Sequence, residues 1–230
     1  MNIKEFDNTP VSTPVFPLTP PSIMIRHSPL KRCFDIAFSL ACFLVGAPVF
    51  LMIALLIFLT SPGKVIYSHE RIGRGGLPFR CYKFRSMHSN ADERLKEILK
   101  TDPIRREEWE KNYKLKDDPR ITRLGTFLRK TSLDELPQFW NVLKGDLSVV
   151  GPRPVVKEEI TRYYQGKAEK ILSIRPGLTG LWQVSGRSDV STYQKRVEME
   201  EYYVDNHSFL LDLKLIARTI PAIIFNKGAY

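Results

Sequence analysis

The stretch from Ile36 to Leu59 contains no charged residue, and it constrains the fold more than any other part of the chain. A continuous helix of this length would be roughly 36 Å long, because each residue adds about 1.5 Å. The hydrocarbon core of a bilayer is about 30 Å thick. The run therefore predicts either a membrane segment or a helix that is buried in a protein core.

Pro48 lies in the middle of this run, directly after Gly46 and Ala47. A proline inside a helix removes one hydrogen bond and clashes with the carbonyl four residues earlier, so a bend is expected here. Basic residues flank both ends of the run, and the positive-inside rule therefore favours crossing in neither direction. We expect a re-entrant membrane helix over residues 30–62, broken at Pro48. A kinked spanning helix and a buried core helix remain the alternatives.

The regions on either side of this segment differ in composition. Prolines recur through residues 1–29, which predicts a disordered tail rather than a cleaved signal peptide. Residues 63–230 are long enough to form one compact domain. The three cysteines are widely spaced and suggest no disulfide framework, which is typical of a reducing, cytosolic setting.

The charge balance indicates an anionic partner. The chain has 35 Lys and Arg against 25 Asp and Glu, a formal net charge of +10. Nucleic acid, membrane lipid and a phosphorylated substrate would each suit this balance. No base-reading motif is recognised, so we expect no nucleic acid partner.

A β-hairpin is predicted after the apolar run. Residues 65–67 and 77–87 favour strands, and the glycines of residues 73–76 favour a turn between them. Side chains alternate along a strand, so Lys83 and Arg85 would share one face. Together they could bind one anion, or they could form a solvated cationic edge that discourages aggregation.

Two adjacent acids, Asp134 and Glu135, follow a basic stretch. Ser132 and Glu135 match a helix capping box, which is a purely structural explanation. Pro137 fits that register poorly but is harmless if Asp134 is the cap. Either register places both carboxylates at the start of a helix of about ten residues that ends near Gly145.

The same acids could also perform chemistry on phosphate. An aspartate can attack phosphorus to form an acyl phosphate, while a neighbouring glutamate binds Mg²⁺. Arg129 and Arg153 could bind phosphate oxygens through their guanidinium groups. Arg153 lies between Pro152 and Pro154, which limits the freedom of its backbone.

Several long motifs occur in order between Lys31 and Tyr230, and through them the chain resembles the bacterial sugar transferases. These enzymes are also called monotopic phosphoglycosyl transferases or polyprenyl-phosphate hexose-1-phosphate transferases. The matching segments are Lys31-Arg-Cys-Phe-Asp35, Tyr82-Lys-Phe-Arg-Ser-Met87, Leu128-Arg-Lys-Thr-Ser-Leu-Asp-Glu-Leu-Pro-Gln138, Gly145-Asp-Leu-Ser-Val-Val-Gly-Pro-Arg-Pro154 and Arg175-Pro-Gly-Leu-Thr-Gly-Leu-Trp-Gln-Val-Ser-Gly-Arg187.

The resemblance implies an α+β fold: a helix-rich cytosolic catalytic domain with a short β-hairpin, anchored by a re-entrant membrane helix. It implies Asp134 as the nucleophile and Glu135 as the ligand of Mg²⁺. The family often has Ser-Pro at the helix break, where this chain has Ala47-Pro48. The phosphate or nucleotide contacts that the resemblance implies are Lys83, Arg85, Arg129, Arg153 and Arg187.

The implied reaction transfers a sugar-1-phosphate from a UDP-sugar to undecaprenyl phosphate and releases UMP. The short chain and its C-terminal sequence are most similar to galactose-1-phosphate transferases that initiate exopolysaccharide assembly. UDP-glucose or another UDP-hexose is the alternative donor, and a non-catalytic membrane scaffold is the alternative class. The expected location is the cytoplasmic face of the bacterial inner membrane, with an interfacial C-terminal helix over residues 209–225. A homodimer is left open.

Overall fold

A computed structural model of the chain describes residues 28–112, 115–185 and 193–224. Nearly all of the predicted disordered tail, and Arg187, lie outside these residues. The described part is rich in helices and contains two small sheets, each of two strands. This agrees with the predicted helix-rich α+β fold that carries one long apolar helix.

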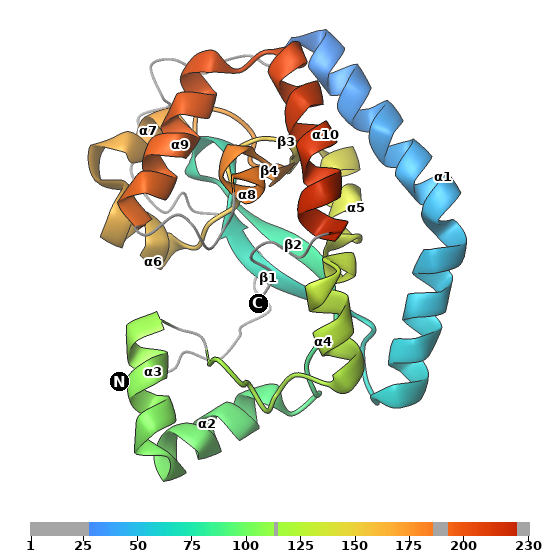
Figure 1. Cartoon of the computed structure of the whole chain (residues 1–230), viewed down its shortest axis with the longest axis vertical. Coiled ribbons are helices and arrows are strands. Elements are labelled where there is room, and N and C mark those ends of the chain that lie inside the picture. The colour runs from blue at the N-terminus through green and yellow to red at the C-terminus, as the bar shows by residue number, and fades with distance from the viewer. Residues whose placement is uncertain (1–27, 113–114, 186–192, 225–230) are drawn as a thin grey trace.

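The apolar run forms a single helix, α1, from Pro29 to Thr60. The side chain of Ser28 accepts a hydrogen bond from the amide of Lys31 and begins the helix, and Pro29 occupies the first turn, where its missing N–H costs nothing. Pro48 lies inside this continuous helix. The re-entrant arrangement stays a prediction, and α1 is not interrupted at Pro48. Its axis nevertheless changes direction along its length (Figure 1).

The N-terminal end of α1 is fixed by buried polar contacts. The ammonium of Lys31 lies 2.6 Å from the carboxylate of Asp212 and donates to the carbonyl of Val150 at 3.1 Å. Asp35 accepts a hydrogen bond of 3.0 Å from the amide of Val149. Lys31, Asp35 and Asp212 are all at least 95% buried. Because a buried charge is costly without a partner, these contacts define where the helix packs.

The C-terminal end of α1 is fixed by apolar packing. Ile53 and Ile57 are each 2% exposed and form one cluster with Phe84 and Leu128. Between the two ends, most of the apolar surface of α1 faces away from the protein. Only 11% of its most apolar 18-residue stretch is buried. Both ends of α1 thus pack against the same domain, while its outer face is left apolar and exposed.

The predicted hairpin is confirmed. Strand β1 (Ile66–Ile72) pairs antiparallel with β2 (Pro78–Phe84), and the connection includes Gly75 and Gly76, both at positive φ. Strand β1 is longer than the sequence predicted. Tyr67, His69 and Arg71 lie opposite Lys83, Cys81 and Phe79, so these six side chains share one face of the hairpin.

The second sheet carries the loop that contains Arg153. Strand β3 (Ser148–Val150) lies parallel to β4 (Gly177–Thr179). Buried side chains from both sides of this sheet form the main core, with Val142, Tyr203 and Leu215 among them. The other helices are α2 (Ala91–Thr101), α3 (Pro103–Asn112), α4 (Arg123–Lys130), α5 (Gln138–Lys144), α6 (Lys157–Glu159), α7 (Ala168–Ile171), α8 (Leu181–Val184), α9 (Tyr193–Asn206) and α10 (Phe209–Ile224).

Helix α10 is apolar on more than one side. Leu215 is 1% exposed and packs in the main core, whereas Leu210 and Ile220 are 62% and 58% exposed. One side of α10 is thus buried in the domain, while the exposed apolar side chains leave its predicted interfacial position a prediction. Its N-terminal turn lies beside that of α1, because Lys31 pairs with Asp212.

Candidate active site

The two adjacent acids lie in a tight turn between α4 and α5. Ser132 adopts a left-handed conformation (φ 56°), and Leu133–Glu135 form a single 3-10 turn. Ser132 makes no capping hydrogen bond to any described residue, and Pro137 occupies the N-cap position of α5. Neither predicted capping register occurs, although the acids do precede a helix.

This turn presents the acids unequally. Asp134 is only 7% exposed, whereas the side chain of Glu135 is 29% exposed. Burial raises the pKa of Asp134. The neighbouring ammonium of Lys83 lowers that pKa, and the negative charge of Glu135 raises it further. Asp134 is therefore a sheltered carboxyl group whose charged form depends on nearby cations.

Lys83 provides one of these cations. It extends from β2, and its ammonium nitrogen lies 2.6 Å from Oε1 of Glu135 and 3.8 Å from Oδ2 of Asp134. Arg129, near the end of α4, provides a second: its positive charge also lowers the pKa of Asp134. The Nε group of Arg129 donates to the hydroxyl of Ser86 at 2.9 Å, which holds the guanidinium in place.

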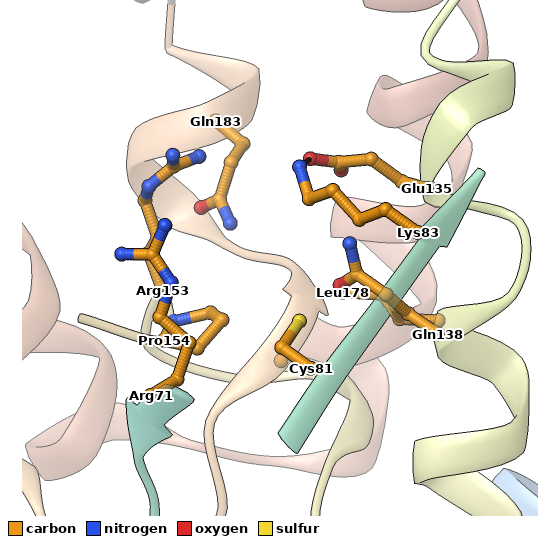
Figure 2. A pocket seen from close by; sticks show the side chains of 10 residues that line it. Arg71, Cys81, Lys83, Glu135, Gln138, Arg153, Pro154, Leu178 and Gln183 are labelled. Atoms are coloured by element: carbon orange, nitrogen blue, oxygen red, sulfur yellow. Dashed lines mark hydrogen bonds and ion pairs between the residues drawn. The ribbon is translucent and has the colours of Figure 1, made fainter. Parts of the chain in front are cut away.

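A cleft separates the acids from a second group of cations. Figure 2 shows Lys83 and Glu135 on one side of the cleft, and Arg71 and Arg153 on the other. We call Lys83, Asp134 and Glu135 the acid wall, and Arg71 and Arg153 the arginine wall. Asp134 itself is set back behind the lining. The described residues that line the cleft are Arg71, Cys81, Lys83, Glu135, Gln138, Arg153, Pro154, Gly177, Leu178 and Gln183.

Arg153 contacts a buried acid, Glu200, through its backbone and the ring of Trp182 through its side chain. Its backbone amide donates to Oε1 of Glu200 at 3.1 Å, and its guanidinium carbon lies 5.4 Å from the centre of the Trp182 ring. Glu200 is fully buried, and burial raises its pKa to about 7. Trp182 therefore stacks on an arginine rather than simply filling the core.

A layer of charged and aromatic side chains supports Arg71 as well. Arg71 lies 4.0 Å from a carboxylate oxygen of Glu159, and Arg196 lies 3.8 Å from the other. The guanidinium of Arg196 is 4.7 Å from the ring centres of both Trp182 and Tyr193. The arginine wall thus rests on a packed layer that leaves it little freedom to move.

The sequence did not single out Arg71, Gln138 or Gln183 as cleft residues. A signal for Arg71 existed: had the first strand been extended to Ile72, the hairpin register would have placed Arg71 on the face of Lys83. The two glutamines carry no comparable signal. Their positions follow from how α5 and α8 pack around the cleft.

Three predicted site residues in the described part of the chain do not line the cleft: Asp134, Arg85 and Arg129. The guanidinium of Arg85 donates to the carbonyls of Ser61 and Pro62, just after α1, and so ties β2 to the end of that helix. Arg187 lies outside the described residues. Lys83 and Arg153 do line the cleft, and Arg129 acts on Asp134 from behind it.

Glu135, the predicted Mg²⁺ ligand, lies on the acid wall. Carboxylate oxygens are ligands that Mg²⁺ favours. In the described part of the chain, no three His, Cys, Asp or Glu side chains are grouped to hold a metal. Glu135, the predicted ligand, would therefore hold Mg²⁺ only together with water and the oxygens of a substrate phosphate, which is usual for this ion.

Comparison with known proteins decides the family. Residues 26–226 match the family described as bacterial sugar transferase. The chain belongs to the bacterial sugar transferase family. The match covers the acid wall, the arginine wall and all of α1.

Three named proteins are similar to this sugar transferase over most of its length. It is 52% identical over 202 residues to "Undecaprenyl-phosphate galactose phosphotransferase" of Salmonella typhimurium, covering 87% of this chain and 42% of the relative. It is 49% identical over 211 residues to "UDP-galactose-lipid carrier transferase" of Erwinia amylovora, covering 90% and 43%. It is 47% identical over 200 residues to "Exopolysaccharide production protein ExoY" of Sinorhizobium fredii, covering 87% and 88%.

The first two of these relatives are much longer than the match. This sugar transferase spans less than half the length of each, whereas it spans most of the third. What the longer proteins do as wholes therefore comes to this chain only by proposal.

Proposed function

We propose that this chain transfers a hexose-1-phosphate from a UDP-hexose to undecaprenyl phosphate and releases UMP, as the first step of exopolysaccharide assembly. The observation that carries the proposal is the cleft itself: Glu135 and Lys83 line it opposite two arginines (Figure 2). Asp134 lies next to this lining, with its Oδ2 3.8 Å from the ammonium of Lys83, and the charge of Arg129 also acts on it. Cations on both sides suit a diphosphate, and a sheltered aspartate suits a nucleophile.

The proposed first half-reaction uses Asp134. Its carboxylate attacks the β-phosphorus of the donor, the bond from that phosphorus to the bridging oxygen breaks, and the oxygen leaves as part of UMP. Burial raises the pKa of Asp134, so Lys83 and Arg129 are needed to keep the carboxylate charged. The product of this step is a hexose phosphate bound to the aspartate as an acyl phosphate.

In the second half-reaction, a phosphate oxygen of undecaprenyl phosphate attacks the same phosphorus. The bond to the aspartate breaks, the carboxylate of Asp134 is regenerated, and a lipid-linked diphosphate sugar is formed. Mg²⁺, bound by Glu135 and phosphate oxygens, would neutralise the charge of the diphosphate. Arg71 and Arg153 would hold phosphate oxygens from the opposite side of the cleft. Arg85 as a phosphate contact stays a prediction.

The packing of α1 supports a re-entrant arrangement in the membrane. A helix that crosses a bilayer carries its ends to surfaces about 30 Å apart. Here, Lys31 near one end and Ile57 near the other pack against the same domain. With both ends on one side, the exposed apolar face of α1 would enter a single leaflet. We infer that this is the cytoplasmic leaflet, where a UDP-sugar is available.

The donor sugar is proposed to be galactose. Support comes from the printed names of the two relatives with galactose in their descriptions, at 52% and 49% identity. The lining of the cleft offers Gln138 and Gln183 as neutral groups that can donate to or accept from sugar hydroxyls. UDP-glucose is the main competing donor.

The test separates the two half-reactions. The purified full chain in lipid nanodiscs is incubated with Mg²⁺ and UDP-galactose, without acceptor lipid. We expect about one equivalent of UMP and a hexose phosphate adduct on Asp134 in mass spectra, and neither in Asp134→Asn. Adding undecaprenyl phosphate should discharge the adduct and raise UMP release to many equivalents, because the regenerated carboxylate turns over again. A panel with UDP-glucose and other UDP-sugars then identifies the donor. No adduct and no UMP with any donor would leave the scaffold alternative standing.

A further inference from the structure

The acid wall already contains a cation. The ammonium of Lys83 lies 2.6 Å from a carboxylate oxygen of Glu135 and 3.8 Å from one of Asp134. It therefore contacts the carboxylate that would hold Mg²⁺, that of Glu135, and lies close to that of Asp134. A metal ion that binds Glu135 must displace this ammonium or share the carboxylate with it, and both positive charges would then be within a few ångströms.

We propose that Lys83 is a displaceable counter-ion of the acid pair, and that a divalent cation and a nucleotide diphosphate consequently bind the cleft cooperatively. The diphosphate draws the ammonium of Lys83 away from Glu135 and supplies oxygen ligands to the metal. This inference rests on the proposed function, since it takes the diphosphate of the donor as the ligand.

Lys83 has the freedom that this role requires. Its side chain is 32% exposed and lines the cleft, so its ammonium can reach a phosphate without unfolding any element. A lysine is also a flexible chain that ends in a point charge. Arg153 differs, because its backbone is tied to Glu200 and its guanidinium rests on Trp182. Of these two cations, Lys83 is the one that can exchange partners.

The scarcity of protein ligands makes the coupling strong. Among the described residues, no third acid, histidine or cysteine joins Asp134 and Glu135. The metal alone would have to compete with Lys83 for two carboxylates, whereas with the diphosphate it gains ligands and loses a competitor at once. Such coupling is reciprocal, so the metal must strengthen diphosphate binding by the same factor.

The experiment measures binding, without turnover. Mn²⁺ replaces Mg²⁺ because it accepts the same oxygen ligands, and the loss of the spectrum of free Mn²⁺ in electron paramagnetic resonance reports its binding. The full chain in nanodiscs is titrated with Mn²⁺ alone, as wild type, Lys83→Met, Lys83→Arg and Lys144→Met. Lys144 is the matched control, because it pairs with Asp146 at 3.0 Å, outside the lining of the cleft.

We expect Lys83→Met to bind Mn²⁺ roughly tenfold more tightly than wild type, because the competing charge is gone. Lys83→Arg and Lys144→Met should match wild type. The melting temperature of Lys83→Met shows whether the variant is folded. A folded Lys83→Met that binds Mn²⁺ no more tightly than wild type overturns the proposal.

A second measurement uses the wild type, so it does not depend on the folding of a variant. Dialysis equilibrium with UDP, which carries the diphosphate without the hexose, should show roughly tenfold tighter UDP binding when Mn²⁺ is present. UDP binding that is unchanged by Mn²⁺ overturns the proposal. The adduct on Asp134 reports separately on the proposed function: an adduct without this coupling removes only the role of Lys83, and coupling without an adduct removes only the transfer reaction.

Discussion

The acid wall and the arginine wall hold their charges in different ways. On the acid wall, Lys83 extends from β2, and its ammonium lies next to the carboxylates of Asp134 and Glu135. On the arginine wall, Arg153 is fixed by Glu200 and Trp182, which lie behind it. The difference fits the proposed division of tasks, in which a preformed wall would bind phosphate and the ion pairs of the other wall would rearrange during the reaction.

The largest expected effect comes from removing the nucleophile of the acid wall. Asp134→Asn keeps the size of the side chain but cannot form the acyl phosphate, so turnover should fall by at least about 10³-fold. UMP release, followed with an enzyme-coupled assay, checks this. UDP binding should be retained, since the arginine wall is intact. Turnover within tenfold of wild type would exclude Asp134 as the nucleophile.

A smaller loss is expected from the arginine wall. Arg153→Met removes a guanidinium that is already in position, so kcat/KM for the donor should fall by about 10²-fold. Arg80→Met is the control, because Arg80 is an exposed arginine of the same hairpin whose side chain lies on the opposite face from Lys83. Equal losses in both variants would mean that general positive charge, and not the arginine wall, is what matters.

The contribution of Glu200, which supports the arginine wall, to the free energy of unfolding should depend on pH. Burial raises the pKa of Glu200 to about 7 in the folded protein, from an ordinary value of 4.5. The folded state therefore binds more protons than the unfolded state between these values, and this contribution to stability is lost as pH rises through about 7. Glu200→Gln cannot ionise, so its stability relative to wild type should increase from pH 4.5 to pH 7.5, by at most roughly 3 kcal/mol.

Thermal unfolding of both proteins across this pH range measures the difference directly. A melting-temperature difference between Glu200→Gln and wild type that stays constant with pH would show that folding does not raise the pKa of Glu200. Glu201→Gln is a suitable control, because Glu201 pairs with Lys167 and Lys170 at the surface.

The smallest effect concerns the frame of the acid wall. Gly145 ends α5 at φ 92°, where a residue with a Cβ is strained. Gly145→Ala should lower the free energy of unfolding by about 1 kcal/mol, with little change in kcat at low temperature. Gly166→Ala is the control, since a Cβ there meets nothing within 4 Å. Chemical denaturation of the two variants would detect the difference, and equal stabilities would contradict it.

The sequence predicted the acid wall better than the arginine wall, and the reason is physical. Asp134 and Glu135 are neighbours in the chain, so a local motif brings them together. Arg196 and Glu200 lie on α9 and support a loop near residue 153, and only tertiary packing makes their charges buried. Local patterns also misled: Ser132 and Glu135 match a capping box, yet the left-handed turn at Ser132 takes its place.

The fold divides in the same way. The hairpin and the long apolar helix follow from composition and periodicity within single segments. The pair between Lys31 and Asp212 joins residues 181 positions apart, and no local pattern indicates it. A bend at Pro48 was expected from proline chemistry, and the axis of α1 does change direction along its length (Figure 1), although the helix is continuous through Pro48.

The pairing of α1 with the catalytic domain limits how this enzyme can be made soluble. Deleting α1 would leave Asp212 without Lys31, with the hydroxyl of Tyr203 as its remaining partner in the buried network. It would also uncover Phe84 and Leu128, which Ile53 and Ile57 now cover. A water-soluble version should therefore keep the inner face of α1 and replace exposed leucines of its outer face, such as Leu44 and Leu51, with polar residues.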